Sequence, residues 1–154
     1  AMSSSRHETM DAAALELENF LPYRFNRLAD AVSRDFARIY KDRHGLTRPE
    51  WRLLATLGQY GTMTATAVGR HSAMHKTKVS RAVTALEKRH WLTRRPDGAD
   101  RRVDNLALTK AGARVYRELV PIARDFEEKL LARVSPQDRS AMLAGMRALE
   151  RALL

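Results

Sequence analysis

Two short extended runs interrupt a chain of 154 residues whose apolar positions otherwise recur at the three-and-four spacing of helices. The runs are WLTRR (91–95) and VDNLALT (103–109), and the turn-rich segment PDGAD (96–100) joins them. In the second run Leu106 and Leu108 are separated by one residue, as in a half-buried strand. The pattern predicts a β-hairpin inside a mainly helical (α+β) fold, and it restricts the fold class more than any other segment does.

Helical spacing on both sides of the hairpin predicts six helices. They are expected at residues 20–44, from Thr47 to the glycine pair Gly58 and Gly61, at 63–72, 75–89 and 110–133, and from Ser135 onward. Thr47 and Glu50 have the spacing of a capping box, which marks the start of the second helix. A tight turn at residues 73–74 separates the third helix from the fourth, and the hairpin follows directly. This order predicts a winged helix-turn-helix with N- and C-terminal dimerisation helices.

The positive charge is unevenly distributed. The formal net charge is +10, from 28 Lys and Arg against 18 Asp and Glu. Residues 70–102 contain ten cations and three anions, whereas the rest of the chain has a net charge of only +3. Such an excess suits a polyanion, because cations that neutralise phosphates release counterions. A solvated basic face on an ordinary helical protein is the alternative, but the concentration of charge on the predicted helix-turn-helix and hairpin favours nucleic acid.

Helix 75–89 lies where winged helix-turn-helix proteins carry their recognition helix. Its Val79, Val83 and Leu86 form an apolar stripe, and the opposite side carries cations and hydroxyls suited to phosphates and base edges. The candidates for DNA contact on this helix are Lys76, Thr77, Lys78, Ser80, Arg81 and Thr84. The hairpin tip, with Arg101 and Arg102, is compact and doubly cationic, which suits a narrow minor groove.

Several other classes of protein are disfavoured. The sequence has no cysteine, which excludes disulfides, thiolate metal sites and cysteine nucleophiles. His71 and His75 are four residues apart, but the predicted turn separates them, so neither a metal nor a cofactor is expected. No spacing of a nucleophile and a base indicates an enzyme. No apolar run approaches the ~20 residues of a membrane span and residues 1–18 lack a signal-peptide pattern, so a cytoplasmic protein is expected.

The terminal helices carry heptad-like apolar stripes. Such stripes can bind a membrane surface or a second copy of the chain. A homodimer is the simpler interpretation, because one winged domain makes few groove contacts and two domains double them.

Three motifs together resemble the MarR family of bacterial transcription regulators. They are LTRPEWRLLATL (46–57), MHKTKVSRAVTALEKR (74–89), and DRR (100–102) six residues before LTKAG (108–112). The resemblance covers roughly residues 20–150, and its most specific parts are the VSRAV core of the recognition helix and the D-x-R wing followed by L-T-x-x-G. It implies a homodimer whose terminal helices interlock, with two winged domains straddling a palindromic operator in double-stranded DNA.

The resemblance also implies roles for individual residues. In the wing, Arg102 is expected to enter the minor groove while Asp100 orients it. The segment from Lys76 to Arg81 matches the first turns of the family's recognition helix. The segment 109–112 corresponds to the structural start of the fifth helix and is not expected to contact DNA.

An effector pocket between the dimer helices and the winged domain is a further implication of the family. Tyr40, His44, Trp51 and Arg52 lie near that junction by sequence. Aromatic rings with an arginine suit an aromatic carboxylate or a similar anion. The alternative is that Tyr40 and Trp51 are core residues and that Arg52 is exposed.

Two positions depart from the family's pattern. His75 stands where relatives have Ser, Thr or Asp to cap the recognition helix; a neutral imidazole caps weakly, or it reaches a phosphate instead. His90 stands where a glycine is usual, so it must accept an unfavourable backbone if the turn there is left-handed.

The sequence thus predicts a ligand-released repressor of palindromic operators. Its expected organisation is an N-terminal dimerisation region (1–45), a winged helix-turn-helix (46–109) and C-terminal dimerisation helices (110–154). A sequence-nonspecific architectural DNA-binding protein is the alternative, and a zinc-dependent sensor is a third possibility that a chelator would reveal.

Overall fold

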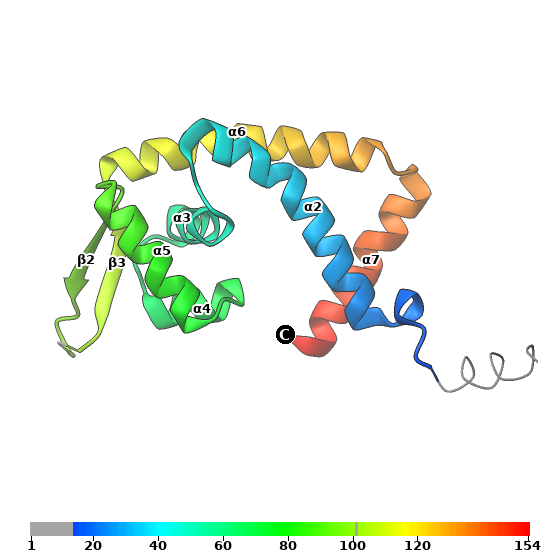
Figure 1. The fold of residues 1–154 in the computed structure, drawn as a ribbon, viewed down its shortest axis with the longest axis horizontal. Helices are drawn as coiled ribbons and strands as arrows, with labels where there is room; N and C mark the ends of the chain where they lie inside the picture. The colour runs from blue at the N-terminus through cyan, green and yellow to red at the C-terminus, as the bar shows by residue number, and fades with distance from the viewer. Residues whose placement is uncertain (1–13, 101) are drawn as a thin grey trace, which may run out of the picture. The chain divides into compact units, whose positions relative to one another are not determined.

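The computed structural model describes residues 14–100 and 102–154. Along the chain these residues form η1 (Leu17–Asn19), α2 (Leu21–His44), α3 (Arg48–Tyr60), β1 (Met63–Thr64), α4 (Ala65–Ser72), α5 (Lys76–Lys88), β2 (Leu92–Pro96), β3 (Asp104–Leu108), α6 (Lys110–Ala132) and α7 (Pro136–Leu153). They belong to two compact units, one ending at Ile39 and the other running from Tyr40 to Leu154. The predicted winged helix-turn-helix is present and lies in the second unit (Figure 1).

The predicted hairpin is confirmed, and it belongs to a small antiparallel sheet of order β1-β3-β2. In the hairpin Leu92 pairs with Leu108, and on the other edge Met63 pairs with Leu106. The prediction that a helix begins at Met63 was therefore wrong by two residues. Thr64 has an extended backbone and its side chain accepts a hydrogen bond from the Ala67 amide, so α4 begins only after Thr64.

The capping box at the start of α3 is confirmed. The Thr47 amide donates to the Glu50 carboxylate, and the Thr47 side chain accepts from the Glu50 amide. The helix continues through Gly58 and ends before Gly61, whose φ of 80° suits a residue without a Cβ atom. A Cβ added at Gly58 would lie 2.5 Å from the Tyr116 ring, so this glycine permits the close approach of α3 and α6.

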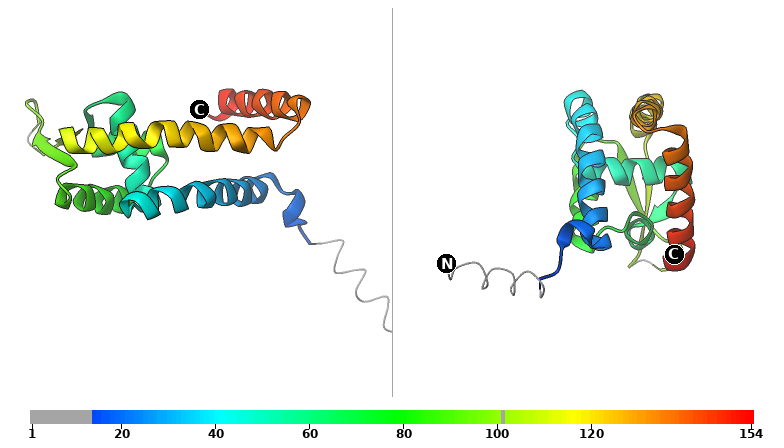
Figure 2. Two further views of the ribbon diagram at one scale, coloured as in Figure 1. Left: turned by 90° about the horizontal axis from the view of Figure 1, so that it is seen from above. Right: turned by 90° about the vertical axis from the view of Figure 1, so that its right-hand side faces the viewer.

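One apolar core joins the helices and the sheet of the winged domain. Side chains from all of these elements are at most 2% exposed: Leu53, Leu54, Val68, Leu86, Leu92, Leu106 and Leu119. In Figures 1 and 2 α3, α4 and α5 pack together beside the hairpin, with the first turns of α6 over α3. Burying a large aliphatic side chain stabilises a fold by roughly 1.5–3 kcal/mol, so the buried residues of α5 attach this helix to the core.

The C-terminal end of α5 has the hydrogen bonds of a Schellman motif. The Trp91 amide donates to the Leu86 carbonyl and the His90 amide donates to the Glu87 carbonyl, each at 3.0 Å. His90 has a φ of 60°, so the turn that the sequence left open is left-handed, at a residue that is not glycine. This backbone costs His90 about 1 kcal/mol relative to glycine.

The start of α6 is joined to that same turn. Thr109 caps α6, donates its hydroxyl proton to the His90 carbonyl at 2.7 Å, and donates its amide proton to the Trp91 carbonyl at 3.0 Å. A Cβ added at Gly112 would lie 2.1 Å from the Trp91 oxygen, so only glycine fits there. The L-T-x-x-G motif therefore has the predicted structural role of starting α6.

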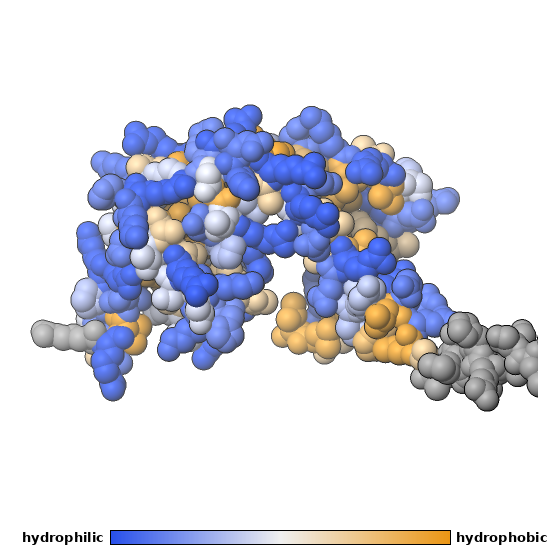
Figure 3. All heavy atoms as spheres, viewed as in Figure 1, coloured by the Kyte–Doolittle hydropathy of each residue, from blue (hydrophilic) through white to orange (hydrophobic). Residues whose placement is uncertain are grey.

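The terminal helices differ from this core. None of the residues of α7 is buried, and Met142, Met146, Leu149 and Leu153 are 37–72% exposed. In the first unit, Phe25 and Leu28 of α2 are 46% and 59% exposed. Figure 3 shows hydrophobic residues gathered at the surface near the start of α2 and near the end of α7. Among the described residues, no helix combines the length and the apolar character needed to cross a membrane.

Candidate nucleic-acid interface

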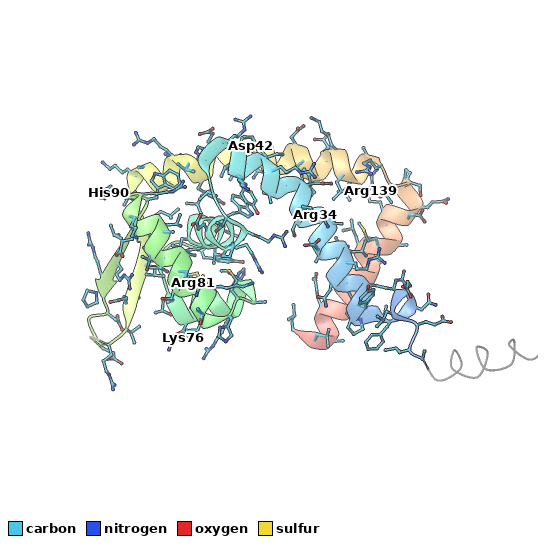
Figure 4. All side chains as sticks on the ribbon, in the orientation of Figure 1. Arg34, Asp42, Lys76, Arg81, His90 and Arg139 are labelled. Carbon is cyan, nitrogen blue, oxygen red and sulfur yellow. The ribbon has the colours of Figure 1, made fainter. Side chains whose placement is uncertain are left out.

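The two faces of α5 have opposite environments. Val79, Ala82, Val83 and Leu86 are at most 3% exposed and pack into the core. The opposite face is exposed and carries all six helix residues predicted to contact DNA: Lys76, Thr77, Lys78, Ser80, Arg81 and Thr84. Figure 4 labels Lys76 and Arg81 on this helix, and the surface over α5 and the hairpin is largely hydrophilic in Figure 3. The structure thus brings the predicted helix residues together on one surface.

Among the described residues, no carboxylate neutralises the lysines and the arginine of this face. Within the ranges 14–100 and 102–154, Lys76, Lys78 and Arg81 form no ion pair with a carboxylate. The Thr84 hydroxyl donates to the Ser80 carbonyl at 3.1 Å, which leaves its oxygen free to accept. The exposed face of α5 therefore offers cationic donors together with hydroxyl groups.

His75 caps the N-terminal end of α5. Its backbone is extended, and its Nδ1 accepts a hydrogen bond from the Thr77 amide at 3.3 Å. A ring nitrogen that accepts is unprotonated, so in the neutral imidazole the Nε2 atom carries the proton. The weak cap expected from the sequence is confirmed, and Ala73, at φ 52°, makes the turn that precedes it.

At the tip of the wing, Asp100 holds Arg102. The Asp100 carboxylate accepts from the Arg102 amide at 3.0 Å and from its Nε at 3.3 Å. The Arg102 side chain is 91% exposed, so it projects from the wing while Asp100 fixes its base. Arg101, the other predicted contact at this tip, lies outside the described residues.

Arg94 has a role that sequence reasoning missed. Its Nε and Nη2 atoms donate to the two oxygens of Glu87, each at 3.1 Å, and its Nη1 lies 3.7 Å from Asp104. The hydrogen bonds from Arg94 lower the pKa of Glu87, and the same bonds raise the pKa of Arg94. Arg94 was counted among the ten cations of residues 70–102 without a partner being named for it, and it connects α5 to both strands of the hairpin. Glu87 and Arg94 are seven residues apart in sequence, and this spacing did not indicate that they pair.

Arg89 is also used inside the chain. Its guanidinium donates to the carbonyl oxygens of His44 and Gly45 and lies over the Trp91 ring, 4.7 Å from the centroid. The last turn of α5 is therefore bound to the C-terminal end of α2, and Arg89 is not available to a phosphate in this arrangement.

The four residues expected at an effector pocket have definite surroundings. Tyr40 is 1% exposed and stacks on Trp51 at 5.7 Å, and burial raises the pKa of the Tyr40 hydroxyl. Arg52 is exposed and donates to the Ser72 carbonyl, while the His44 Nε2 lies 3.4 Å from a Glu118 oxygen. Packing and internal contacts thus engage all four residues in this structure.

No group of three or more potential metal ligands gathers among the described residues. His71 lies in α4, where its Nε2 is 2.9 Å from the Tyr60 hydroxyl, whereas His75 caps α5. As predicted, the turn separates the two histidines.

The winged domain matches the model of the MarR family over residues 46–103. A curated relative, the uncharacterized HTH-type transcriptional regulator YwoH of Bacillus subtilis, is 32% identical over 97 residues, which are 63% of this chain and 70% of that protein. A solved MarR family transcriptional regulator from Silicibacter pomeroyi has a TM-score of 0.79 and 26% identity, covering 92% of this chain and all of that one.

Two solved structures at lower identity share the fold. One is MepR of S. aureus in a complex with DNA, with a TM-score of 0.75 and 20% identity over 88% of this chain and 99% of that chain. The other is PcaV of Streptomyces coelicolor in complex with its natural ligand, with a TM-score of 0.72 and 22% identity over 92% of this chain and 99% of that chain.

Proposed function

This chain belongs to the MarR family of transcription regulators, and from that premise we propose that it is a homodimeric repressor that binds palindromic operators in double-stranded DNA. The observation that carries the proposal is the exposed face of α5, on which Lys76, Lys78 and Arg81 have no carboxylate partner among the described residues. In the proposed complex this face lies in the major groove, and Arg81 and Thr77 read base edges there.

The wing supplies the second contact. Arg102 reaches the minor groove beside the recognition helix, and Asp100 restricts the conformations of its side chain. Holding an arginine before binding reduces the entropy that is lost when it enters the groove. Residues 46–109 carry the DNA contacts in this proposal, and residues 1–45 and 110–154 form the dimer.

The exposed apolar residues of α7 support the homodimer. Met142, Met146, Leu149 and Leu153 recur at a spacing of four, three and four, which places them on one face of the helix. Exposed clusters of this kind commonly mark protein interfaces. A dimer aligns two recognition helices with two half-sites, which accounts for a palindromic operator.

We also propose that a small molecule releases the DNA, with Tyr40, His44, Trp51 and Arg52 near its site. Two structural relatives support this proposal. PcaV was solved in complex with its natural ligand, and 6-hydroxynicotinic acid regulates the DNA binding of Bordetella bronchiseptica BpsR. A ligand weakens DNA binding only if it prefers a dimer whose recognition helices do not match the half-sites.

The test is fluorescence anisotropy with two labelled duplexes at physiological salt: the intergenic DNA beside the protein's own gene, and a shuffled control. The proposal expects tighter binding to the intergenic duplex by a factor of ~10³ or more. Equal binding to both, with a steep salt dependence, would instead support the architectural alternative. Addition of small aromatic acids to the specific complex then tests release.

A further inference from the structure

Helix α6 carries a row of positive charges on the side that faces away from the core. Residues 110–124 contain four cations and a single acid, Glu118. The cations lie within an arc of roughly 80° around the helix axis at 3.6 residues per turn. We call this row the α6 stripe; its members, all exposed, are Lys110, Arg114, Arg117 and Arg124. The buried residues Gly112, Val115 and Leu119 lie on the opposite side of the same helix.

The acids nearest to the α6 stripe are engaged elsewhere. The Glu118 oxygens lie 3.7 Å from the Arg43 Nη1 and 3.4 Å from the His44 Nε2, both at the C-terminal end of α2. The Asp125 carboxylate lies 2.8 Å from the Lys129 Nζ. In the part of the chain that the structure describes, no cation of the stripe forms an ion pair with a carboxylate. The charge of the stripe is therefore not compensated by its neighbours.

The surroundings of the α6 stripe favour duplex DNA as its partner. None of the exposed large hydrophobic side chains of the described residues belongs to residues 110–124. Helices that lie on membranes have an apolar face beside their cations, and protein interfaces centre on apolar and aromatic residues. Single-stranded nucleic acid needs exposed aromatic rings on which its bases stack. Interfaces with duplex DNA are polar and strongly positive, as this surface is.

The dimensions and the residue types of the α6 stripe also suit a duplex. A helix rises 1.5 Å per residue, so Lys110 and Arg124 are about 21 Å apart along the axis. That length corresponds to about six base pairs of B-DNA at 3.4 Å each. Three of the four cations are arginines, whose planar guanidinium can donate to two phosphate oxygens at once.

We propose that the α6 stripe binds the phosphate backbone of a second DNA duplex while the exposed face of α5 holds the first, so that the protein bridges two segments of DNA. The two surfaces share no residue, and Figure 1 shows the first half of α6 on the other side of α3 from α4. Contacts to phosphates carry no sequence information, so the second segment can have any sequence. Selection of the first duplex rests on the proposed function, whereas the contact of the stripe with DNA does not.

A bridging assay tests the proposal. The biotinylated intergenic duplex is immobilised on beads, loaded with protein and washed, and a fluorescent duplex of shuffled sequence is then added. The fluorescent duplex stays on the beads only if the protein holds both duplexes. We expect capture with a Kd of roughly 10⁻⁴–10⁻⁶ M at physiological salt, the range of nonspecific binding. Absence of protein-dependent capture would overturn the proposal.

Two double variants locate the contact. Arg114→Gln with Arg117→Gln removes two charges from the stripe, and Arg147→Gln with Arg151→Gln removes two charges from exposed positions of α7 as a matched control. The stripe variant should capture the second duplex at least tenfold more weakly, while its Kd for the immobilised duplex changes less than twofold. The slope of log K for the second duplex against log salt concentration should fall by about two. The control should behave as the unmodified protein does.

Thermal unfolding verifies that both variants are folded. Unchanged capture in the stripe variant would overturn the proposal, because a dimer could then bridge two duplexes through its two α5 helices alone. An equal loss of capture in the stripe variant and the control would also overturn it, since net charge rather than the stripe would then be responsible.

Two further outcomes separate this inference from its alternatives. Equal binding of the intergenic and shuffled duplexes would refute the proposed function, but bridging of two shuffled duplexes that the stripe variant loses would still support the stripe. Binding to phosphatidylglycerol vesicles that the stripe variant loses, with unchanged capture of the second duplex, would assign the stripe to a membrane surface and overturn the proposal.

Discussion

Helices α5 and α7 have the same kind of sequence and opposite surroundings. Each has apolar residues at helical spacing and a polar face, yet four residues of α5 are buried and none of α7 is. In α5 the apolar side contributes to the core and the polar side is exposed. In α7 the apolar side itself remains exposed. Amphipathic spacing therefore predicts that a helix has a face to bury, and the surrounding chain decides whether that face is buried within the molecule.

The largest contrast should come from one substitution made in both helices. Leu86→Ala removes a side chain that is 0% exposed and should lower the free energy of unfolding by about 2–5 kcal/mol at any protein concentration. Leu149 is 37% exposed, so Leu149→Ala should cost stability only where dimers form. Urea denaturation at two protein concentrations measures both. A cost for Leu149→Ala that is as large as that for Leu86→Ala and independent of concentration would contradict the distinction.

A charge placed on the exposed face of α7 tests the proposed dimer. Met146→Asp should raise the dimer dissociation constant on the order of 100-fold, because an unpaired carboxylate would be buried at the interface. Analytical ultracentrifugation gives the dissociation constant. Arg147→Asp is the control, since it places a carboxylate at the neighbouring, exposed polar position. An unchanged dissociation constant in Met146→Asp would place the interface elsewhere.

The left-handed residue at the end of α5 should change the free energy of unfolding by about 1 kcal/mol when it is replaced by glycine, and the direction of the change can be predicted. His90→Gly should raise the free energy of unfolding by about that amount, because His90 has a left-handed backbone that glycine adopts without strain. Lys88→Gly, at the last residue of the helix, should instead lower it, because glycine is a poorer helix former. Thermal denaturation of the pair checks both signs, and two changes of the same sign would argue against the conformational explanation.

The smallest expected effect concerns Glu87 and Arg94, which bind α5 to the hairpin. A double-mutant cycle of Glu87→Gln and Arg94→Gln should give a coupling of about 0.2–1 kcal/mol, because both side chains are about two-fifths exposed. The pKa of Glu87 is lowered in the folded protein. The coupling is therefore complete above the ordinary glutamate pKa and is lost as the pH falls through the lowered value. A coupling that persists at low pH would refute the ion-pair assignment.

The sequence allowed the local features of the fold to be predicted well. The capping box of Thr47 and Glu50, the turn before His75 and the hairpin are each encoded in a few adjacent residues, and all are present. Strand β1 was missed because two residues have no periodicity and Met63 acquires its pairing only from Leu106, far along the chain.

The predictions for the exposed face of α5 were limited in the same way. Exposure of the α5 residues followed from helical spacing, and all six are exposed. A count of charges along the sequence could not show that Arg89 and Arg94 have partners within the fold, because those partners come from other elements. Composition therefore located the basic region, and only the structure separates the free cations from those already bound.

The turn at Trp91 has a consequence for protein engineering. The end of α5, the hairpin and the start of α6 meet there through backbone groups, and Gly112 leaves no space for adjustment. Exchanging single residues on α5 leaves this junction untouched, but a graft that cuts between residues 88 and 112 would have to rebuild it. Under the proposed function, DNA specificity would be transplanted between related chains by replacing the exposed side chains of α5, while the scaffold from His90 to Gly112 is inherited whole.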